Sequence, residues 1–201
     1  MKRLDERHFS RTLDVLTRAF EDDELYQYLE PDTAERHRFV RDFLTFRTRY
    51  LFKRCQVFAD GDEIHSVMAA APAGQAMSKL DFVLCGGLGP LLRATPTVRR
   101  RMLDFVSYLD RCEEECCPRP HQMLGPLATH PDHQGKGLGG ALFSHMVNEV
   151  CDPNVALCLD TQTPRNVQLY EKYGFYVVKE EFVPGSRVTN FVMLRDPGGK
   201  M

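Results

Sequence analysis

The sequence predicts a single globular domain of mixed α/β (α+β) class. Apolar residues make up 43% of the 201 residues and charged residues 27%, which is an ordinary globular composition. Helical spacing of apolar residues in the first half is followed by short strand-like runs. No repeat or low-complexity linker divides the chain. We therefore expect one domain over residues 1–201.

The first half favours two helices and a hairpin. Apolar residues share one helix face over 12–20, and Asp32 stands where it can cap a second, long helix that runs toward Phe52. The apolar runs 56–59 and 64–69 flank an Asp-Gly pair, which is typical of a β-hairpin.

The later elements follow the same logic. Glycine and proline make residues 74–96 a predicted loop, and helical spacing returns over 98–112. A buried strand is expected at 122–129, a helix after Gly140, and a further strand at 155–159. The last third thus reads as strand, glycine-rich turn, helix and strand.

Charge and cysteine content exclude several classes of protein. The 26 Lys and Arg residues nearly balance 28 Asp and Glu, which argues against a nucleic-acid or anionic-membrane binder. The longest uncharged run, 64–78, is too short to span a bilayer. The charged start of the chain resembles no export signal, so the seven cysteines are expected as free thiols in the cytoplasm. Cys112, Cys116, Cys117 and His121 contain no CxxC pair, and no metal is expected.

The glycine-rich turn predicts an anion site. The first N–H groups of a helix lack partners and carry the positive end of the helix dipole, and glycines let a phosphate approach the backbone. Gly135, Gly137 and Gly140 also match a dinucleotide-binding fingerprint, with Asp160 twenty residues further on. Against that alternative, residues 130–134 separate the strand from the first glycine, and too little chain remains for a doubly wound sheet.

Two motifs resemble those of the GNAT acetyltransferase superfamily. The segment 127–139, LATHPDHQGKGLG, is similar to its acetyl-CoA signature, and 166–175, NVQLYEKYGF, is similar to its second signature. Within the superfamily the pattern is nearest to the puromycin N-acetyltransferase group. The resemblance implies a mixed central sheet with helices on both faces and strands that splay around the glycine-rich turn. It also implies an acceptor-side half, 1–120, and an acetyl-CoA-binding core, 121–195.

The resemblance also assigns a co-substrate and its contacts. Acetyl-CoA would lie along the strand ending at Thr129, with its pyrophosphate on the glycine-rich turn and its arm near the following motif. The residues expected to bind it are Leu127, Ala128, Thr129, Gln134, Gly135, Lys136, Gly137, Leu138, Gly139, Gly140 and Asn166. A backbone N–H near Leu127 would polarise the thioester carbonyl.

Tyr170 is the expected general acid. It follows Asn166 by one helical turn, and a phenol stays protonated at neutral pH. Asp160, at a strand end, is a candidate general base, although a capping or loop role fits it equally well. The other candidates are His121 and the acidic run Asp22, Asp23 and Glu24.

The expected activity is transfer of an acetyl group to a primary amine of a small molecule, by direct attack in a ternary complex. A protein N-terminus or lysine as acceptor, and a non-catalytic acyl-CoA sensor, remain alternatives. We expect no nucleic-acid, membrane or metal partner, and a monomer or homodimer.

Overall fold

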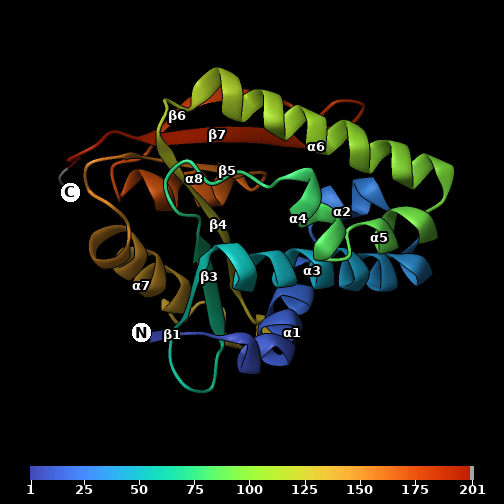
Figure 1. Ribbon diagram of the computed structural model, residues 1–201, viewed down its shortest axis with the longest axis horizontal. Helices are drawn as coiled ribbons and strands as arrows, with labels where there is room; N and C mark the ends of the chain where they lie inside the picture. Colours follow the sequence, from blue (N-terminus) through green and yellow to red (C-terminus); the bar gives the residue numbers. More distant parts are fainter. Residues whose placement is uncertain (200–201) are drawn as a thin grey trace.

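The computed structural model describes residues 1–199, in which seven strands form one mixed sheet (Figure 1). The strand order is β1-β2-β3-β4-β5-β7-β6. Neighbouring strands are antiparallel except β4 and β5, which are parallel. The strands are β1 (Lys2–Arg3), β2 (Gln56–Ala59), β3 (Ser66–Ala70), β4 (His121–Thr129), β5 (Ala156–Thr161), β6 (Tyr176–Phe182) and β7 (Thr189–Arg195).

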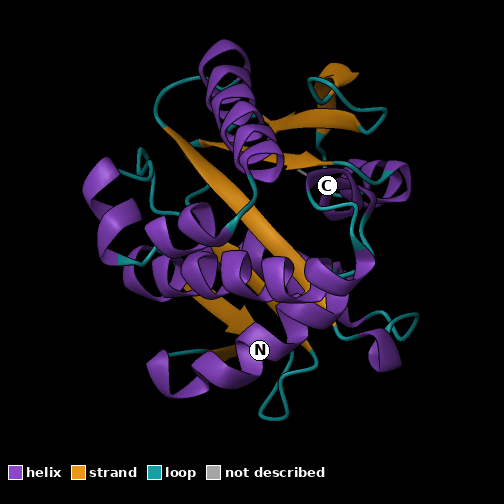
Figure 2. Cartoon of the chain, turned by 90° about the vertical axis from the view of Figure 1, so that its right-hand side faces the viewer, coloured by secondary structure: helices purple, strands orange, loops and turns teal. Residues whose placement is uncertain are grey.

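Helices cover both faces of this sheet (Figure 2). They are α1 (Phe9–Phe20), α2 (Glu24–Leu29), α3 (Thr33–Arg54), α4 (Lys79–Leu84), α5 (Leu88–Arg93), α6 (Pro96–Cys116), α7 (Leu138–His145) and α8 (Pro164–Glu171). Helices α1, α3 and α6 share one apolar core, while α7 and α8 enclose a second one. The predicted mixed sheet with helices on both faces is therefore confirmed.

Local signals begin two helices where the sequence places them. The Asp32 side chain accepts the Ala34 N–H at 2.8 Å and caps α3. Pro164 stands in the first turn of α8, where its missing N–H costs nothing. Both assignments are confirmed.

The hairpin is confirmed, but its second strand begins and ends later in the chain than predicted. Strand β2 covers the predicted 56–59, but β3 is 66–70 rather than 64–69. Ile64 has φ 55 and leaves the extended region. The Asp60 carboxylate accepts the N–H groups of His65 and Ser66, which fixes the longer turn.

The prediction of a loop over 74–96 is wrong, since α4 and α5 lie within it. Both helices are too short to show a periodicity of their own. Ser78 caps α4 in a capping box with Asp81, and Asp81 forms an ion pair with Arg54 of α3 at 2.7 Å. Contacts with α3, distant in sequence, thus stabilise the segment. Helix α6 begins at Pro96, two residues before the predicted spacing, and ends at Cys116, close to the expected end near Pro118.

All seven cysteines are free thiols, as expected. None of the helices within residues 1–199 combines the length and apolar character that crossing a bilayer requires.

Candidate active site

A cavity of about 540 Å³ lies between α3, α6 and the α4–α5 segment, over one face of the sheet. Its floor is formed by Met123 and Gly125 of β4, Asp160 of β5 and Val192 of β7. The exposed side chains of Leu103 and Val106 stand at its edge on α6. A volume of this size suits a small molecule.

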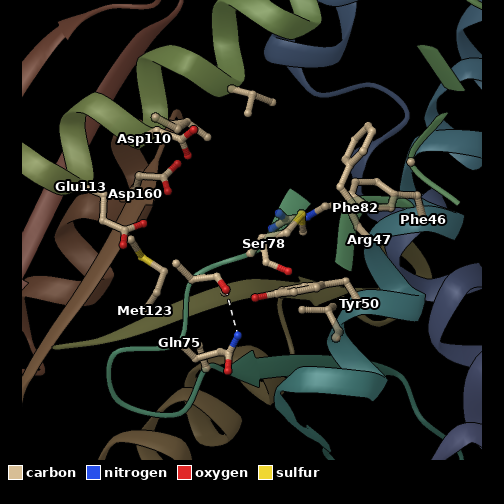
Figure 3. A pocket seen from close by; sticks show the side chains of 18 of the residues that line it. Phe46, Arg47, Tyr50, Gln75, Ser78, Phe82, Asp110, Glu113, Met123 and Asp160 are labelled. Carbon is tan, nitrogen blue, oxygen red and sulfur yellow. Dashed lines mark hydrogen bonds between the residues drawn. The ribbon is translucent and has the colours of Figure 1, made fainter. Parts of the chain in front are cut away.

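One side of the cavity is aromatic (Figure 3). Phe46 of α3 meets Phe82 of α4 edge-on, with ring centroids 5.1 Å apart, and Phe43 meets Phe46 at 6.2 Å. Tyr50, one turn further along α3, continues this side. The surface fits an apolar or aromatic group.

The opposite side is acidic. Asp110 and Glu113 project from α6, and Asp160 lies beside them (Figure 3). Burial raises the pKa of Asp160 above its ordinary value, while the Gln162 amide donates to its Oδ2 at 2.9 Å and opposes that rise. Among residues 1–199, Asp160 forms no ion pair. A half-buried carboxylate that forms no ion pair is suited to receive an ammonium group or a proton.

Strand β4 separates from β5 halfway along its length. The two strands pair only from His121 to Met123, whereas β4 continues along β3 to Thr129. The N–H of His130 donates to His65 O on the β3 side, so the polar groups of residues 127 and 129 face away from β3. Consistent with this, the Thr129 carbonyl accepts the Gln134 side-chain amide at 3.1 Å. The Leu127 N–H therefore points into the opening beside β4.

The glycine-rich turn follows β4 after residues 130–134, which include a short 3-10 turn, Pro131–His133. Gly135 and Gly137 have φ 76 and φ 78, and an added Cβ at either would meet nothing within 4 Å. The first intrahelical hydrogen bond of α7 joins Ala141 N to Gly137 O. The N–H groups just before Ala141 therefore have no partner within the helix. A Cβ at Gly139 would lie 3.1 Å from Thr129 Oγ1, so the first turn of α7 packs closely against β4. The exposed turn thus presents unpartnered N–H groups beside the end of β4.

Tyr170 lies on the opposite face of the sheet from the cavity. Its ring is 6% exposed and packs against Phe143 with centroids 4.8 Å apart. Burial raises its pKa well above the ordinary value, and the charge of Asp160 adds to the rise. Within residues 1–199 its hydroxyl donates no hydrogen bond. A protonated phenol with an uncommitted hydroxyl is therefore present near Asp160.

Asn166 stands one turn before Tyr170 on α8. Its side-chain amide donates to Thr161 Oγ1 at 3.4 Å, at the end of β5. Helix α8 is thereby anchored to the strand that carries Asp160. The second sequence motif thus lies at the same end of β5 as the acidic side of the cavity.

Residues 101–177 match the family model described as an acetyltransferase (GNAT) domain. The solved structure of histone acetyltransferase HPA2 and related acetyltransferase from Corynebacterium glutamicum is 18% identical, with a TM-score of 0.66 over 100% of this chain and 97% of that one. Mosquito arylalkylamine N-acetyltransferase like 5b is 14% identical, with a TM-score of 0.64 over 97% and 98%. This chain has the GNAT fold.

A curated relative matches a shorter stretch of this chain. The L-amino acid N-acyltransferase MnaT of Escherichia coli (strain K12) is 33% identical over 63 residues. The match covers 30% of this chain and 37% of that relative, so it spans little more than a third of the relative's length.

The GNAT fold keeps several predicted candidates away from the cavity. Asp22 and Asp23 lie between α1 and α2, Glu24 begins α2, and none of the three lines the cavity. His121 is 7% exposed, with its Nε2 3.2 Å from Glu113 Oε1 and its Nδ1 2.9 Å from Pro118 O. Of the candidate bases, only Asp160 lines the cavity of the described chain.

The cysteines group differently from the sequence expectation. The ligand atoms of Cys117 and His121 lie within 4.8 Å of Cys158, a β5 residue, whereas Cys112 and Cys116 are outside this group. Contact with the Cys117 thiol and burial raise the pKa of Cys158, so Cys158 is a neutral thiol at neutral pH.

Sequence reasoning missed most of the residues that line the cavity in this GNAT fold. Phe82 comes from the segment predicted as a loop, and Arg47 was only one of many charges along α3. Phe43 and Phe46 lie on the predicted second helix, where their apolar character indicates packing and no other role. Nothing in a single sequence indicates that α3, α4 and α6 meet over Asp160.

Proposed function

We propose that this protein is an acetyl-CoA-dependent N-acetyltransferase whose acceptor is a primary amine of a small molecule. The observation that carries the proposal is the opening beside β4. There an outward-facing backbone edge leads to a glycine-rich helix start, and a cavity with a half-buried carboxylate, Asp160, lies alongside. Acetyl transfer to an amine needs a surface that holds the acyl donor beside a pocket that holds the amine, and these three features supply both.

The described residues fit acetyl-CoA. The pyrophosphate would lie against the N–H groups of residues 135–140, where positive φ and open space at Gly135 and Gly137 permit close approach. The N–H of Gln134, expected from the sequence to take part, already donates to Pro131 O at 3.2 Å. Lys136 is exposed beside this turn and adds positive charge. The amide groups of the pantetheine arm would pair with the free edge of β4, as an added strand does. Asn166 would hold the same arm from α8.

The protein's own groups then divide the chemistry. Asp160 holds the incoming ammonium and takes its proton, directly or through water. The Leu127 N–H donates to the carbonyl oxygen as negative charge develops there. As the C–N bond forms and the C–S bond breaks, the nitrogen loses its second proton to solvent, and Tyr170 gives a proton to the departing sulfur and regains one from solvent. No covalent enzyme intermediate is needed, so the amine attacks directly in a ternary complex.

The names of the relatives include protein acceptors as well as small ones, and two of them name small acceptors. The curated relative is named for L-amino acids, and a Drosophila melanogaster polyamine N-acetyltransferase shares the fold with a TM-score of 0.58 and 13% identity. The cavity volume also favours a small molecule over a protein segment. The uncommitted Tyr170 hydroxyl disfavours a sensor without catalysis. Resemblance to the puromycin group, cytoplasmic location and a monomer or homodimer stay predictions.

The test is thiol release from acetyl-CoA in the presence of amines. The panel contains puromycin, polyamines, arylalkylamines, apolar amino acids and a lysine-rich peptide. Turnover with a small amine supports the proposal, whereas turnover with the peptide alone makes the protein acceptor the correct reading. Binding of acetyl-CoA without turnover would make the protein a sensor, and absence of binding would overturn the assignment.

A further inference from the structure

The charges that touch the cavity sort into a rim and an interior. The exposed rim holds two acidic and two basic side chains, which are Asp110, Glu114, Lys79 and Arg119. Three partly buried charges lie inside, namely Glu113, Asp160 and Arg47. Glu113 is occupied by His121 at 3.2 Å. Asp160 and Arg47 remain, one of each sign, and they form no ion pair with each other.

Arg47 differs from every other half-buried arginine of residues 1–199. The others each donate to a protein oxygen; they are Arg11, Arg36, Arg99, Arg101 and Arg195. Arg47 donates to none and stacks on no aromatic ring. A guanidinium carries five donors and is always charged, and the donors of Arg47 are left free to bind a ligand in the cavity. Its position calls for an acceptor from outside the chain.

A hydrogen-bond acceptor for Arg47 would lie inside the cavity. Arg47 enters the cavity from the α3 side, next to Phe46 and Phe82, and faces across the space toward Asp160 (Figure 3). A ligand between the two sides therefore meets a carboxylate at one end, aromatic rings along its body and a guanidinium at the other end. Planar carboxylates match the donor fork of arginine with two parallel hydrogen bonds.

We propose that Arg47 binds a carboxylate of the acceptor, so that the preferred acceptor is an amino acid with an apolar body, its amine at Asp160. This inference rests on the proposed acetyltransferase function and names its substrate class. A polyamine is disfavoured, because its second ammonium would lie near the Arg47 guanidinium without a counter-charge. An amine without an acid group would leave Arg47 unpartnered.

The experiment compares acceptors that differ only in the carboxylate. Apolar α-, β- and γ-amino acids are assayed beside their amides by thiol release from acetyl-CoA, in the wild type, Arg47→Met and Arg47→Lys. Comparing the acid-to-amide ratio of kcat/KM between proteins cancels the different basicities of the amines. The series of chain lengths covers the spacing between the two charged groups.

The wild type should favour at least one amino acid over its amide. Arg47→Met should lower kcat/KM for that acid about 10–100-fold, the range for a lost charge-assisted hydrogen bond, and change the amide less than threefold. Arg47→Lys, which keeps the charge but not the fork, should lie between. Arg49→Met is the matched control, since Arg49 is also on α3 but donates to Cys85 O and does not line the cavity. It should leave the ratio unchanged.

Two results would overturn the inference. One is a wild type that turns over every amide as well as its acid, and the other is an Arg47→Met variant that weakens acids and amides equally. If no acceptor releases thiol, the proposed function fails and binding decides the Arg47 question. A rise of Tm with the amino acids in the wild type but not in Arg47→Met would support the carboxylate site, and no rise in either protein would reject it.

Discussion

Replacing Tyr170 by Phe removes one oxygen and tests the proposed general acid. The ring keeps its contacts with Phe143, 4.8 Å away, and with Phe175 at 6.3 Å. Since the hydroxyl donates to nothing within residues 1–199, no internal hydrogen bond is lost. We expect the free energy of unfolding to change by less than about 1 kcal/mol.

The expected loss of activity is large by comparison. A positioned acid contributes roughly 10²- to 10⁴-fold, which corresponds to about 3–5 kcal/mol of barrier. Burial raises the pKa of Tyr170, so the phenol stays protonated through the assay range. The same desolvation also strengthens the proton affinity of a thiolate released there, so burial alone does not disfavour the transfer. The change should appear in kcat, with the Kd of acetyl-CoA unaltered.

Tyr173→Phe is the matched control on the next turn of the chain. Its hydroxyl donates to Gly140 O at 2.9 Å, at the start of α7. That variant should lose about 0.5–1.5 kcal/mol of stability but keep kcat within a few-fold. Thiol release, calorimetry of acetyl-CoA binding and urea unfolding separate the two effects. A Tyr170→Phe enzyme with more than a fifth of wild-type kcat would refute the assignment of the acid.

Three further predictions concern single substitutions. Asp160→Asn should abolish most activity yet stabilise the fold at neutral pH, because burial raises the pKa of this carboxyl in the folded state. The gain in stability should disappear as pH falls below the ordinary Asp pKa near 3.8, which urea unfolding at a series of pH values would show. Gly137→Ala, at φ 78, should cost roughly 1–2 kcal/mol and weaken acetyl-CoA binding, whereas Gly61→Ala, which has open space and no positive φ, should do neither. Asp32→Ala should remove the cap of α3 and lower the free energy of unfolding by about 1 kcal/mol in thermal or urea melts, with kcat unchanged.

The sequence was most informative where local chemistry decides the structure. Strand β2, the Asp32 cap and Pro164 at the start of α8 depend on nearest neighbours, and each is found as predicted. The strand, glycine-rich turn and helix at 121–145 also follow from backbone requirements that a short motif can express. The GNAT resemblance rested on these same residues.

The rest depends on contacts between distant segments. Helix α4 is stabilised by its Ser78 cap and by the ion pair between Asp81 and Arg54 of α3. Its six residues are too few to show a helical periodicity in the sequence. Cys158 of β5 lies close to Cys117, which precedes β4, because β5 pairs with the beginning of β4. Arg47 differs from the other half-buried arginines because it has no hydrogen-bond or ion-pair partner among residues 1–199. A sequence cannot show this, because it depends on the positions of all the surrounding side chains.

The bulge in β4 explains how one strand serves both the fold and the proposed chemistry. Before it, the Met123 carbonyl accepts the Ala71 N–H, so odd-numbered residues direct their polar groups toward the β3 side. Gly125 and Pro126 then stand opposite the single residue Ala69, which shifts the alternation by one. An unbroken ladder would direct the Leu127 N–H toward β3, where pairing would consume it. With the extra residue, that N–H faces the opening instead, at the point where β5 has already diverged. Proline itself cannot donate, so the break leaves no N–H unpaired at position 126. The irregularity in β4 therefore frees the donor that the proposed reaction would use, at a place where the divergence of β5 has already opened the sheet.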